Sequence, residues 1–298
     1  MNFKVASPLV EARERTWPLP PPSGAHAGAA LWDFLVHLRL PFQLALSVVV
    51  LWGVVWSGGA LTLRFLWVWL AWTVPLSGGA TAYNSYFDRD EGPVGGLRRP
   101  PRVRPSMLWL SLALQLTGGV LLALSATWLD VGVYVLGALV FFAYSTPGIR
   151  TKSRPWRATA TVALGSGALA SLAGSLAAGG GPNLGMLSSA LFIAGFYPLT
   201  QLGQIDEDRR RGDRTFAVAL GRNAGFAWSG VVLPLACALN LWRVGSGSVP
   251  ARVLLLGLAP VALSGILWWR RPGLDASPIA DYLAYTAAVV FAVAALLV

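Results

Sequence analysis

Charged residues are scarce in this chain of 298 residues. Only 12% are Asp, Glu, Lys or Arg and 55% are hydrophobic, whereas soluble domains carry about a quarter charged residues. There is a single cysteine, Cys237, so no intrachain disulfide can form. The first thirty residues lack the apolar segment of a cleavable signal peptide, and we expect none. These shortages exclude an ordinary soluble domain and a disulfide scaffold, and they predict a polytopic membrane protein.

The charge that is present is mostly positive, with a formal net charge of +10. Arginine supplies nearly all of it. In a soluble protein this excess would suggest a nucleic-acid partner. Here the basic residues lie in the loops between apolar stretches, where they orient membrane proteins. We therefore expect the lipid bilayer as partner and no nucleic acid.

Nine apolar stretches of 14 to 22 residues are predicted to cross the membrane, whose hydrocarbon core needs about 20 helical residues. They lie at residues 41–56, 65–83, 107–128, 131–144, 158–178, 186–203, 224–242, 253–269 and 279–298. The fold class predicted is all-α, with nine transmembrane helices. Residues 1–30 are expected to form an irregular cytosolic tail and residues 31–40 a short interfacial helix. The chain then divides into a segment 1–40 and a transmembrane domain 41–298.

The distribution of basic residues predicts the orientation. Clusters of arginine follow the second, fourth, sixth and eighth stretches, whereas the loops after the third and fifth hold none. The side with the positive loops is the cytoplasmic side. We therefore expect the N-terminus in the cytoplasm and the C-terminus on the opposite side. The missing presequence favours a bacterial inner membrane.

A polar segment, Asn84 to Glu91, ends the second stretch. It places three acids, an arginine and an amide where charge is costly unless it is paired, hydrated or used. In a continuing helix Asn84 and Asp88 share a face, because they are four residues apart. Asp90 points elsewhere unless the helix ends beside Asp88, which the following Gly-Pro pair favours.

A second polar segment, Gln204 to Thr215, ends the sixth stretch. Four stretches separate the two segments, so both lie on the same side and can form one site. Carboxylates are hard oxygen ligands that suit Mg²⁺, which usually holds substrate phosphates through one or two acids. Neighbouring arginines could contact the same phosphates. The alternative is that Asp88 and Asp208 only pair with nearby arginines in a solvated loop.

The two segments resemble those of the UbiA superfamily of intramembrane prenyltransferases. That family's first motif, Asn-x-x-x-Asp-x-x-x-Asp, falls on Asn84, Asp88 and Gly92, and its second, Asp-x-x-x-Asp, on Gln204 and Asp208. Further similarities lie between Arg39 and Gly221: Arg39-Leu40-Pro41; Tyr144-Ser145-Thr146-Pro147 with Arg150, Lys152, Arg154 and Pro155; and Gly212-Asp213-Arg214-Thr215 with Ala217-Val218-Ala219-Leu220-Gly221.

The resemblance implies Mg²⁺-dependent transfer of an isoprenyl group from an allylic diphosphate to a hydrophobic acceptor, an aromatic or quinone precursor. The implied catalytic residues are Asn84, Asp88 and Asp208. The implied metal ligands are Asp88, Asp90, Glu91, Asp206 and Asp208. The implied diphosphate-binding residues are Arg39, Arg150, Lys152, Arg154 and Arg209. The faces of Tyr144 and Tyr197 would stabilise an allylic cation by cation–π attraction.

Each motif lacks one acid, since Gly92 and Gln204 stand where the family has aspartates. Neighbouring acids could take over metal binding from shifted positions, which is the interpretation we favour. Alternatively, the site uses fewer metal ions and more arginine, or the chain is a non-catalytic isoprenoid-binding or transport protein. A further alternative is a membrane terpene cyclase of the same fold, in which the substrate's own double bond attacks the cation.

Overall fold

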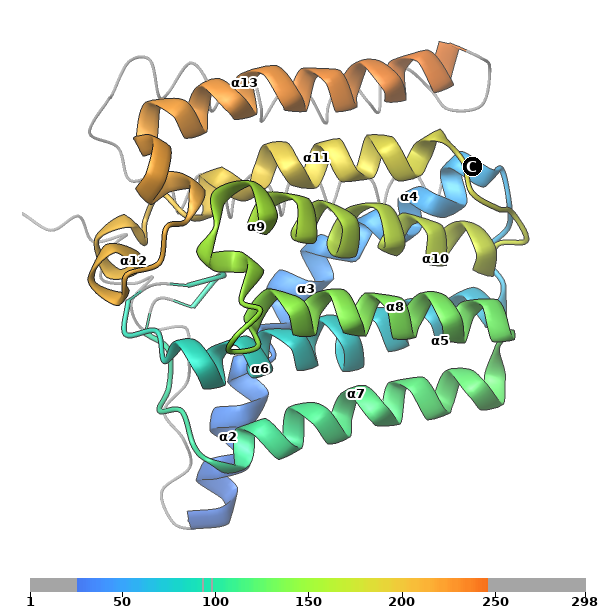
Figure 1. Cartoon of the computed structure of the whole chain (residues 1–298). Coiled ribbons are helices and arrows are strands. Elements are labelled where there is room, and N and C mark those ends of the chain that lie inside the picture. The colour runs from blue at the N-terminus through green and yellow to red at the C-terminus, as the bar shows by residue number, and fades with distance from the viewer. Residues whose placement is uncertain (1–25, 93, 98, 246–298) are drawn as a thin grey trace, which may run out of the picture.

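The computed structural model describes residues 26–92, 94–97 and 99–245. All secondary-structure elements within those ranges are helices, which confirms the all-α class for this part of the chain (Figure 1). The elements are α2 (His26–His37), α3 (Leu40–Leu46), α4 (Val48–Ser57), α5 (Leu63–Ala71), η1 (Trp72–Gly78), α6 (Gly79–Asp88), α7 (Ser106–Ser125), α8 (Trp128–Ser145), η2 (Thr151–Ser153), α9 (Pro155–Val162), η3 (Ala163–Leu169), α10 (Ala170–Ala177), α11 (Leu184–Thr200), α12 (Ile205–Arg211) and α13 (Phe216–Gly245).

The first seven predicted spans each correspond to helical structure. In chain order they are α3 with α4, then α5–η1–α6, α7, α8, α9–η3–α10, α11 and α13. The spans predicted at 253–269 and 279–298 lie outside the described residues, so the count of nine is not confirmed. Five described segments are long and apolar enough to cross a membrane: 28–57, 106–125, 128–145, 155–177 and 216–240.

The helix predicted over residues 31–40 is α2, which runs from His26 to His37. Its residue Phe34, and Leu38 just beyond it, are buried against Ala82 of α6 and Met107 of α7. The chain then turns at Arg39, whose backbone is left-handed (φ 52°, ψ 44°), and α3 begins at the next residue. α2 is thereby packed onto the same end of the bundle that carries the polar segments (Figure 1).

Small residues allow the inner helices to approach closely. A Cβ atom on Gly53 of α4 would collide with the backbone of Ser171 in α10, and one on Gly174 of α10 with the backbone of Val50. Such contacts are typical of helix pairs in membranes, where lipid supplies little hydrophobic drive for association. α7 and α8 instead present exposed apolar side chains, including Leu124 and Trp128, each 81% exposed, as expected of a lipid-facing surface.

Two of the long helices contain a π-helical segment. η1 interrupts α5 and α6 around Pro75, which lacks the N–H that a regular α-helix needs there. η3 interrupts α9 and α10 at a sequence with two buried glycines, Gly165 and Gly167. π-helical turns are rare and frequently lie at functional sites. Ser77 of η1 and Ser166 of η3 both line the cavity described below.

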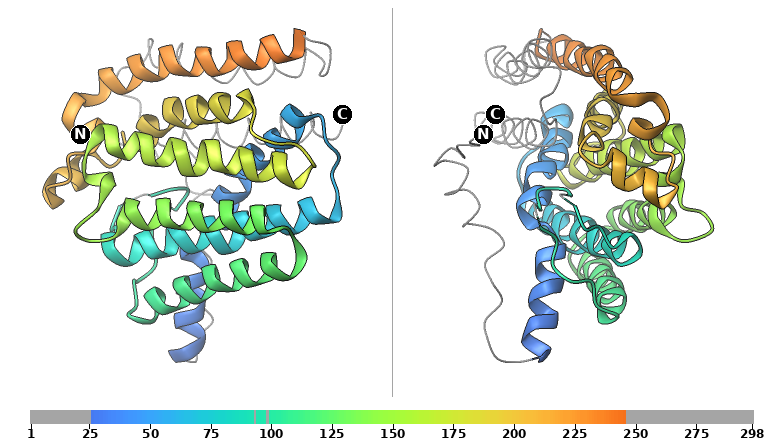
Figure 2. Two further views of the ribbon diagram at one scale, coloured as in Figure 1. Left: turned by 45° about the vertical axis from the view of Figure 1, so that its right-hand side comes forward. Right: turned by 90° about the vertical axis from the view of Figure 1, so that its left-hand side faces the viewer.

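The polar segments gather at one end of the bundle, which we call the site end. α6, α8 and α11 finish there, α9 and α13 begin there, and α12 lies beside them (Figure 1). In the right-hand view of Figure 2 this end faces the viewer, with α12 and the loop after α6 in front of the long helices. Segments that are more than a hundred residues apart in sequence are therefore neighbours here.

Candidate functional site

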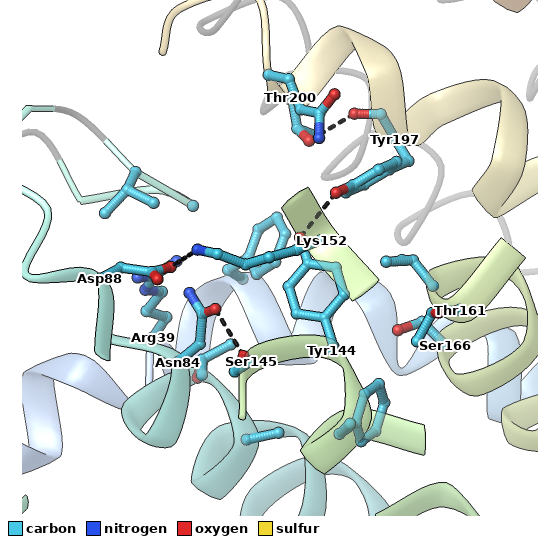
Figure 3. Close-up of a pocket in the computed structure, with 18 of the residues that line it drawn as sticks. Arg39, Asn84, Asp88, Tyr144, Ser145, Lys152, Thr161, Ser166, Tyr197 and Thr200 are labelled. Carbon is cyan, nitrogen blue, oxygen red and sulfur yellow. Dashed lines mark hydrogen bonds and ion pairs between the residues drawn. The ribbon is translucent and has the colours of Figure 1, made fainter. Parts of the chain in front are cut away.

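A cavity of about 200 Å³ opens at the site end. Its outer part is polar and is lined by acids and bases from both predicted segments: Asn84, Asp88, Asp90, Lys152, Asp208 and Arg211. Its inner part is apolar and is lined by Leu46, Phe141, Val162, Ile193 and Phe196. Figure 3 shows Asp88, Lys152 and Asn84 on one side of the cavity and Thr161 and Ser166 on the other, with two tyrosines between them. The two polar segments therefore lie together at one cavity, as predicted.

Asp88, the last residue of α6, is almost fully buried, with 3% of its side chain exposed. It forms an ion pair with Lys152, which is also buried, and lies 3.3 Å from Arg150 Nη2. Buried carboxylates are costly unless they are paired in this way. Asp88 therefore does pair with nearby bases, as one alternative from the sequence proposed. The pairing takes place in the wall of the cavity, however, and not in a solvated loop.

Arg150 connects Asp88 to a third acid, Asp213. Its guanidinium donates to Asp213 through Nε (3.1 Å) and Nη2 (2.9 Å). Burial alone would raise the pKa of Asp213, but the hydrogen bonds from Arg150 and the positive charges of Lys152, Arg150 and Arg211 together lower it. Arg150 holds this geometry with a left-handed backbone, φ 33°.

Asn84 lies one helical turn before Asp88 and faces the same cavity. Its side-chain oxygen accepts a hydrogen bond of 2.8 Å from Ser145 at the end of α8 (Figure 3). The amide is thus held by the neighbouring helix. This fixes the position of the α6 end relative to the loop that carries Arg150 and Lys152.

Asp208 of α12 is the acid from the second segment that reaches the cavity. It is buried, accepts a hydrogen bond from Thr215 Oγ1 (3.1 Å) and lies 3.4 Å from Arg211 Nη2. Burial raises the pKa of Asp208 to about 6, although the contacts with Thr215 and Arg211 act in the opposite direction. Its carboxyl group therefore changes charge close to neutral pH.

Asp90 reaches the cavity because α6 ends at Asp88 and the chain turns at Arg89, which has a left-handed backbone (φ 51°). Its carboxylate accepts a 2.8 Å hydrogen bond from Arg211 Nη1 and lies 3.8 Å from Arg39 Nη2. One oxygen, Oδ2, is buried and has no hydrogen bond. Asp90 is therefore a buried acid whose Oδ2 has no hydrogen bond and only the longer ion pair with Arg39.

Arg39 is buried at the junction of α2 and α3 and lines the cavity. It donates a 2.9 Å hydrogen bond to Ser85 Oγ. Gly95, in the loop after α6, packs directly over its guanidinium, and a Cβ there would lie 2.6 Å from Nη1. The loop thus covers one side of the polar part of the cavity.

Tyr144 and Tyr197 stand where the polar part meets the apolar part. Their hydroxyl groups are hydrogen-bonded at 2.7 Å, and their rings meet edge to face with centroids 6.4 Å apart. Both line the cavity. Their faces are therefore available to a ligand that extends from the carboxylates towards the apolar end (Figure 3).

Five predicted site residues do not line the cavity. Arg150 is one, although it contacts the lining residue Asp88, and the other four lie elsewhere. Asp206 and Arg209 pair with each other on the outer face of α12, with side chains 83% and 62% exposed. Glu91 and Arg154 are exposed. In the described ranges no three His, Cys, Asp or Glu side chains lie close enough together to form a metal-binding group. The roles predicted for these four residues stay predictions.

The sequence did not single out two residues that are central to the geometry of the site, Arg211 and Asp213. Arg211 lies three residues after Asp208, which in a helix is the same face. That spacing was visible in the sequence and could have distinguished Arg211 from Arg209. Asp213 follows the helix-ending Gly212, so only the course of the turn reveals its contact with Arg150.

Comparison with known proteins gives the family. The model of the UbiA prenyltransferase family matches residues 46–285. The chain belongs to this family. Among curated protein sequences none matches it significantly.

Solved structures of UbiA homologues share the fold. One, from Archaeoglobus fulgidus, is bound to GPP and Mg²⁺; it has 18% sequence identity and a TM-score of 0.67, and the match covers 89% of this chain and all of that chain. Another, the apo form from Aeropyrum pernix K1, has 20% identity and a TM-score of 0.63, with 88% and 98% covered. A digeranylgeranylglyceryl phosphate synthase has 17% identity and a TM-score of 0.61, with 90% and 99% covered.

Proposed function

We propose that this integral membrane protein transfers an isoprenyl group from an allylic diphosphate to a hydrophobic acceptor, an aromatic or quinone precursor. The observation that carries the proposal is the two-part cavity, with acids and bases at the outer end and apolar side chains inside. An allylic diphosphate has the same two-part chemistry. By the positive-inside rule the charged end would lie at the cytoplasmic face, and a bacterial inner membrane is the proposed location.

The residues present fit a Mg²⁺ ion. Asp88 and Asp208 face the cavity from opposite motifs, and Asp90 contributes a buried oxygen that has no hydrogen bond. These are hard oxygen donors, which Mg²⁺ prefers, and it usually uses only one or two protein carboxylates together with substrate phosphates. One or two of Asp88, Asp90 and Asp208, together with the substrate's phosphate oxygens, would hold the ion. When bound, it supplies Lewis-acid stabilisation of the charge that develops on the leaving diphosphate.

The protein's own bases would bind and orient the diphosphate. Lys152 and Arg39 line the polar part of the cavity, and Arg150 reaches the same acid as Lys152. As the allylic C–O bond breaks, its electron pair moves to the diphosphate oxygen, where these cations stabilise it. The acceptor then forms a bond to the allylic carbon and loses a proton.

Tyr144 and Tyr197 would protect the allylic cation while it exists. Aromatic faces attract cations by about 0.5–2 kcal/mol. Their hydrogen-bonded hydroxyl groups hold both rings in place. The apolar inner wall would hold the hydrocarbon tail and exclude water, so that the acceptor is the nucleophile.

Release of pyrophosphate from purified protein in detergent tests the proposal. Geranyl, farnesyl and geranylgeranyl diphosphates are supplied with and without Mg²⁺, first without acceptor and then with a panel of phenols. We expect Mg²⁺-dependent release that requires an acceptor. Release without acceptor, accompanied by a cyclic product, would indicate a cyclase. No release from any donor by folded protein would indicate a binding or transport protein.

A further inference from the structure

The guanidinium of Arg211 lies between the two acidic motifs. Its Nη1 donates to the backbone oxygen of Asp88 (2.9 Å) and to Asp90 Oδ1 (2.8 Å) on the α6 side. Its Nη2 lies 3.4 Å from Asp208 Oδ1 and 3.4 Å from Glu207 Oε1 on the α12 side. One fixed cation therefore contacts oxygen atoms of both motifs, which is the arrangement expected of a bridging metal ion.

The missing acid at position 92 belongs to the same arrangement. Glu207 accepts hydrogen bonds from the backbone N–H groups of Glu91 (2.9 Å) and Gly92 (3.3 Å). A Cβ on residue 92 would lie 2.8 Å from Glu207 Oε2. The absence of a side chain at Gly92 thus makes room for the carboxylate that, together with Arg211, joins the α6 loop to α12.

We propose that Arg211 is a built-in cation that replaces one divalent ion, so that the site binds a single Mg²⁺ with its diphosphate. The identity of the ligand rests on the proposed function above, but the ion count does not. Asp88, Asp208 and Asp90 line the same cavity, and Asp90 Oδ2 has no hydrogen bond, so one or two of these carboxylates remain for that one ion. Because Arg211 is covalently part of the chain, its charge is present at any Mg²⁺ concentration.

Counting bound ions tests this inference. The protein is passed through gel filtration at fixed free Mn²⁺, with and without an unreactive geranyl thiolodiphosphate, and its Mn²⁺ content is measured. We expect one Mn²⁺ per chain in the wild type and two in Arg211→Ala. A wild-type count of two, or an Arg211→Ala count of one or none in folded protein, would overturn the inference.

Two further variants keep the test decisive. Arg210→Ala removes an exposed arginine of the same helix that makes no contact with either motif, and its count should stay at one. Arg211→Lys keeps a positive charge and should also bind one ion.

If Arg211→Ala does not fold, Arg211→Gln replaces it, because glutamine removes the charge but keeps a long side chain with N–H donors; this variant should bind two ions, and a count of one overturns the inference. A wild type that binds one ion but releases no pyrophosphate would refute the proposed function alone.

Discussion

Glu207 occupies the space that a side chain at position 92 would need. Its Oε2 accepts the Gly92 N–H at 3.3 Å, and a Cβ on that residue would approach the same oxygen to 2.8 Å. The contact joins the loop after α6 to α12, and so it sets the distance between the acids of the two motifs. A side chain at position 92 would displace the flexible end of Glu207 from its hydrogen bonds with the N–H groups of Glu91 and Gly92.

Restoring the family's aspartate at position 92 should therefore not improve the enzyme. In Gly92→Asp the new side chain displaces Glu207, and we expect a lower melting temperature and weaker Mg²⁺ activation. Adding Glu207→Ala removes the collision, so the double variant should melt above Gly92→Asp. The check is a comparison of the three proteins by thermal unfolding and by pyrophosphate release over a range of Mg²⁺ concentrations. A Gly92→Asp protein that is both more stable and more active than wild type would contradict this account.

The ion pair of Asp88 and Lys152 allows stability and activity to be separated. Lys152→Met leaves a buried acid short of one partner, which costs about 3 kcal/mol of folding free energy when such a pair is broken. In Asp88→Asn/Lys152→Met both charges are gone, so much of this stability should return. Pyrophosphate release should nevertheless stay at least about 100-fold below wild type, since removal of one electrostatic stabiliser typically costs that much.

The measurements for this pair are the free energy of unfolding in detergent and the rate of pyrophosphate release for the single and double variants. Recovery of activity together with stability in the double variant would show that Asp88 has only a structural role.

The pKa of Asp208 predicts how ion binding depends on pH. Because burial raises it to about 6, protons compete with the ion below pH 6, and the apparent Mn²⁺ dissociation constant should rise about tenfold per pH unit there. Thr215→Val removes a hydrogen bond that lowers the pKa, so its transition should lie at higher pH. A dissociation constant that is constant from pH 5 to pH 8 would contradict the prediction.

The same shift affects the stability of the metal-free protein with the opposite sign. An unfolded aspartate titrates near pH 3.9, whereas folded Asp208 holds its proton up to about pH 6. The folded state therefore binds more protons between these values, and Asp208 should destabilise it progressively as the pH rises from about 4 to 6. In Asp208→Asn this contribution should disappear, which thermal unfolding without metal can measure.

The tyrosine pair separates a role of the rings from a role of the hydroxyl groups. Tyr197→Phe keeps the aromatic face and should change the rate of pyrophosphate release by less than about threefold. Tyr197→Leu removes the face and should lower the rate by about 3- to 30-fold, the equivalent of a cation–π attraction of about 0.5–2 kcal/mol. If Phe and Leu reduced the rate equally, the hydroxyl pair and not the ring would be responsible.

Arg89 and Arg150 share a left-handed backbone but differ in contacts. Arg89 is exposed and makes no side-chain contact, whereas Arg150 pairs with Asp88 and Asp213. At a helix end of this kind glycine is the residue without strain, so Arg89→Gly should stabilise the protein by roughly 0.5 kcal/mol. Arg150→Gly should lower both the melting temperature and the activity. Paired thermal unfolding curves decide between these outcomes.

The sequence predicted the helices that the first seven apolar stretches form and the presence of Asp88 and Asp208 in one cavity. Hydropathy reports burial in lipid directly, and an even number of crossings returns the chain to the same side. Side-chain direction near the helix ends was harder to predict. Asp206 and Arg209 were assigned to the site, yet in α12 they face outward, while Arg211 faces the cavity. The residue at which α12 begins decides which of its side chains face the cavity. Hydropathy gives no information on where so short a helix begins.

The contact between the loop after α6 and helix α12 could not be predicted from the sequence for a different reason. The hydrogen bond between Glu207 and the Gly92 N–H depends on how that loop meets a helix 115 residues further along the chain. Composition indicates only that both segments are polar. The compensation expected from Glu91 and Asp206 is not seen in the cavity, whereas Asp90 does reach it because α6 ends two residues earlier.

The π-helical segment η1 lets the second predicted span tolerate a change in its number of residues. A π-helical hydrogen bond encloses one residue more than an α-helical bond, so this segment holds extra chain within an otherwise regular helix. Loss of one residue inside η1 could be absorbed by a return to α-helix, with Asn84 and Asp88 still directed at the cavity. The same loss in α6 would turn them away by about 100°, because an α-helix has 3.6 residues per turn. The second predicted span can therefore lose a residue at η1 while Asn84 and Asp88 keep their direction towards the cavity.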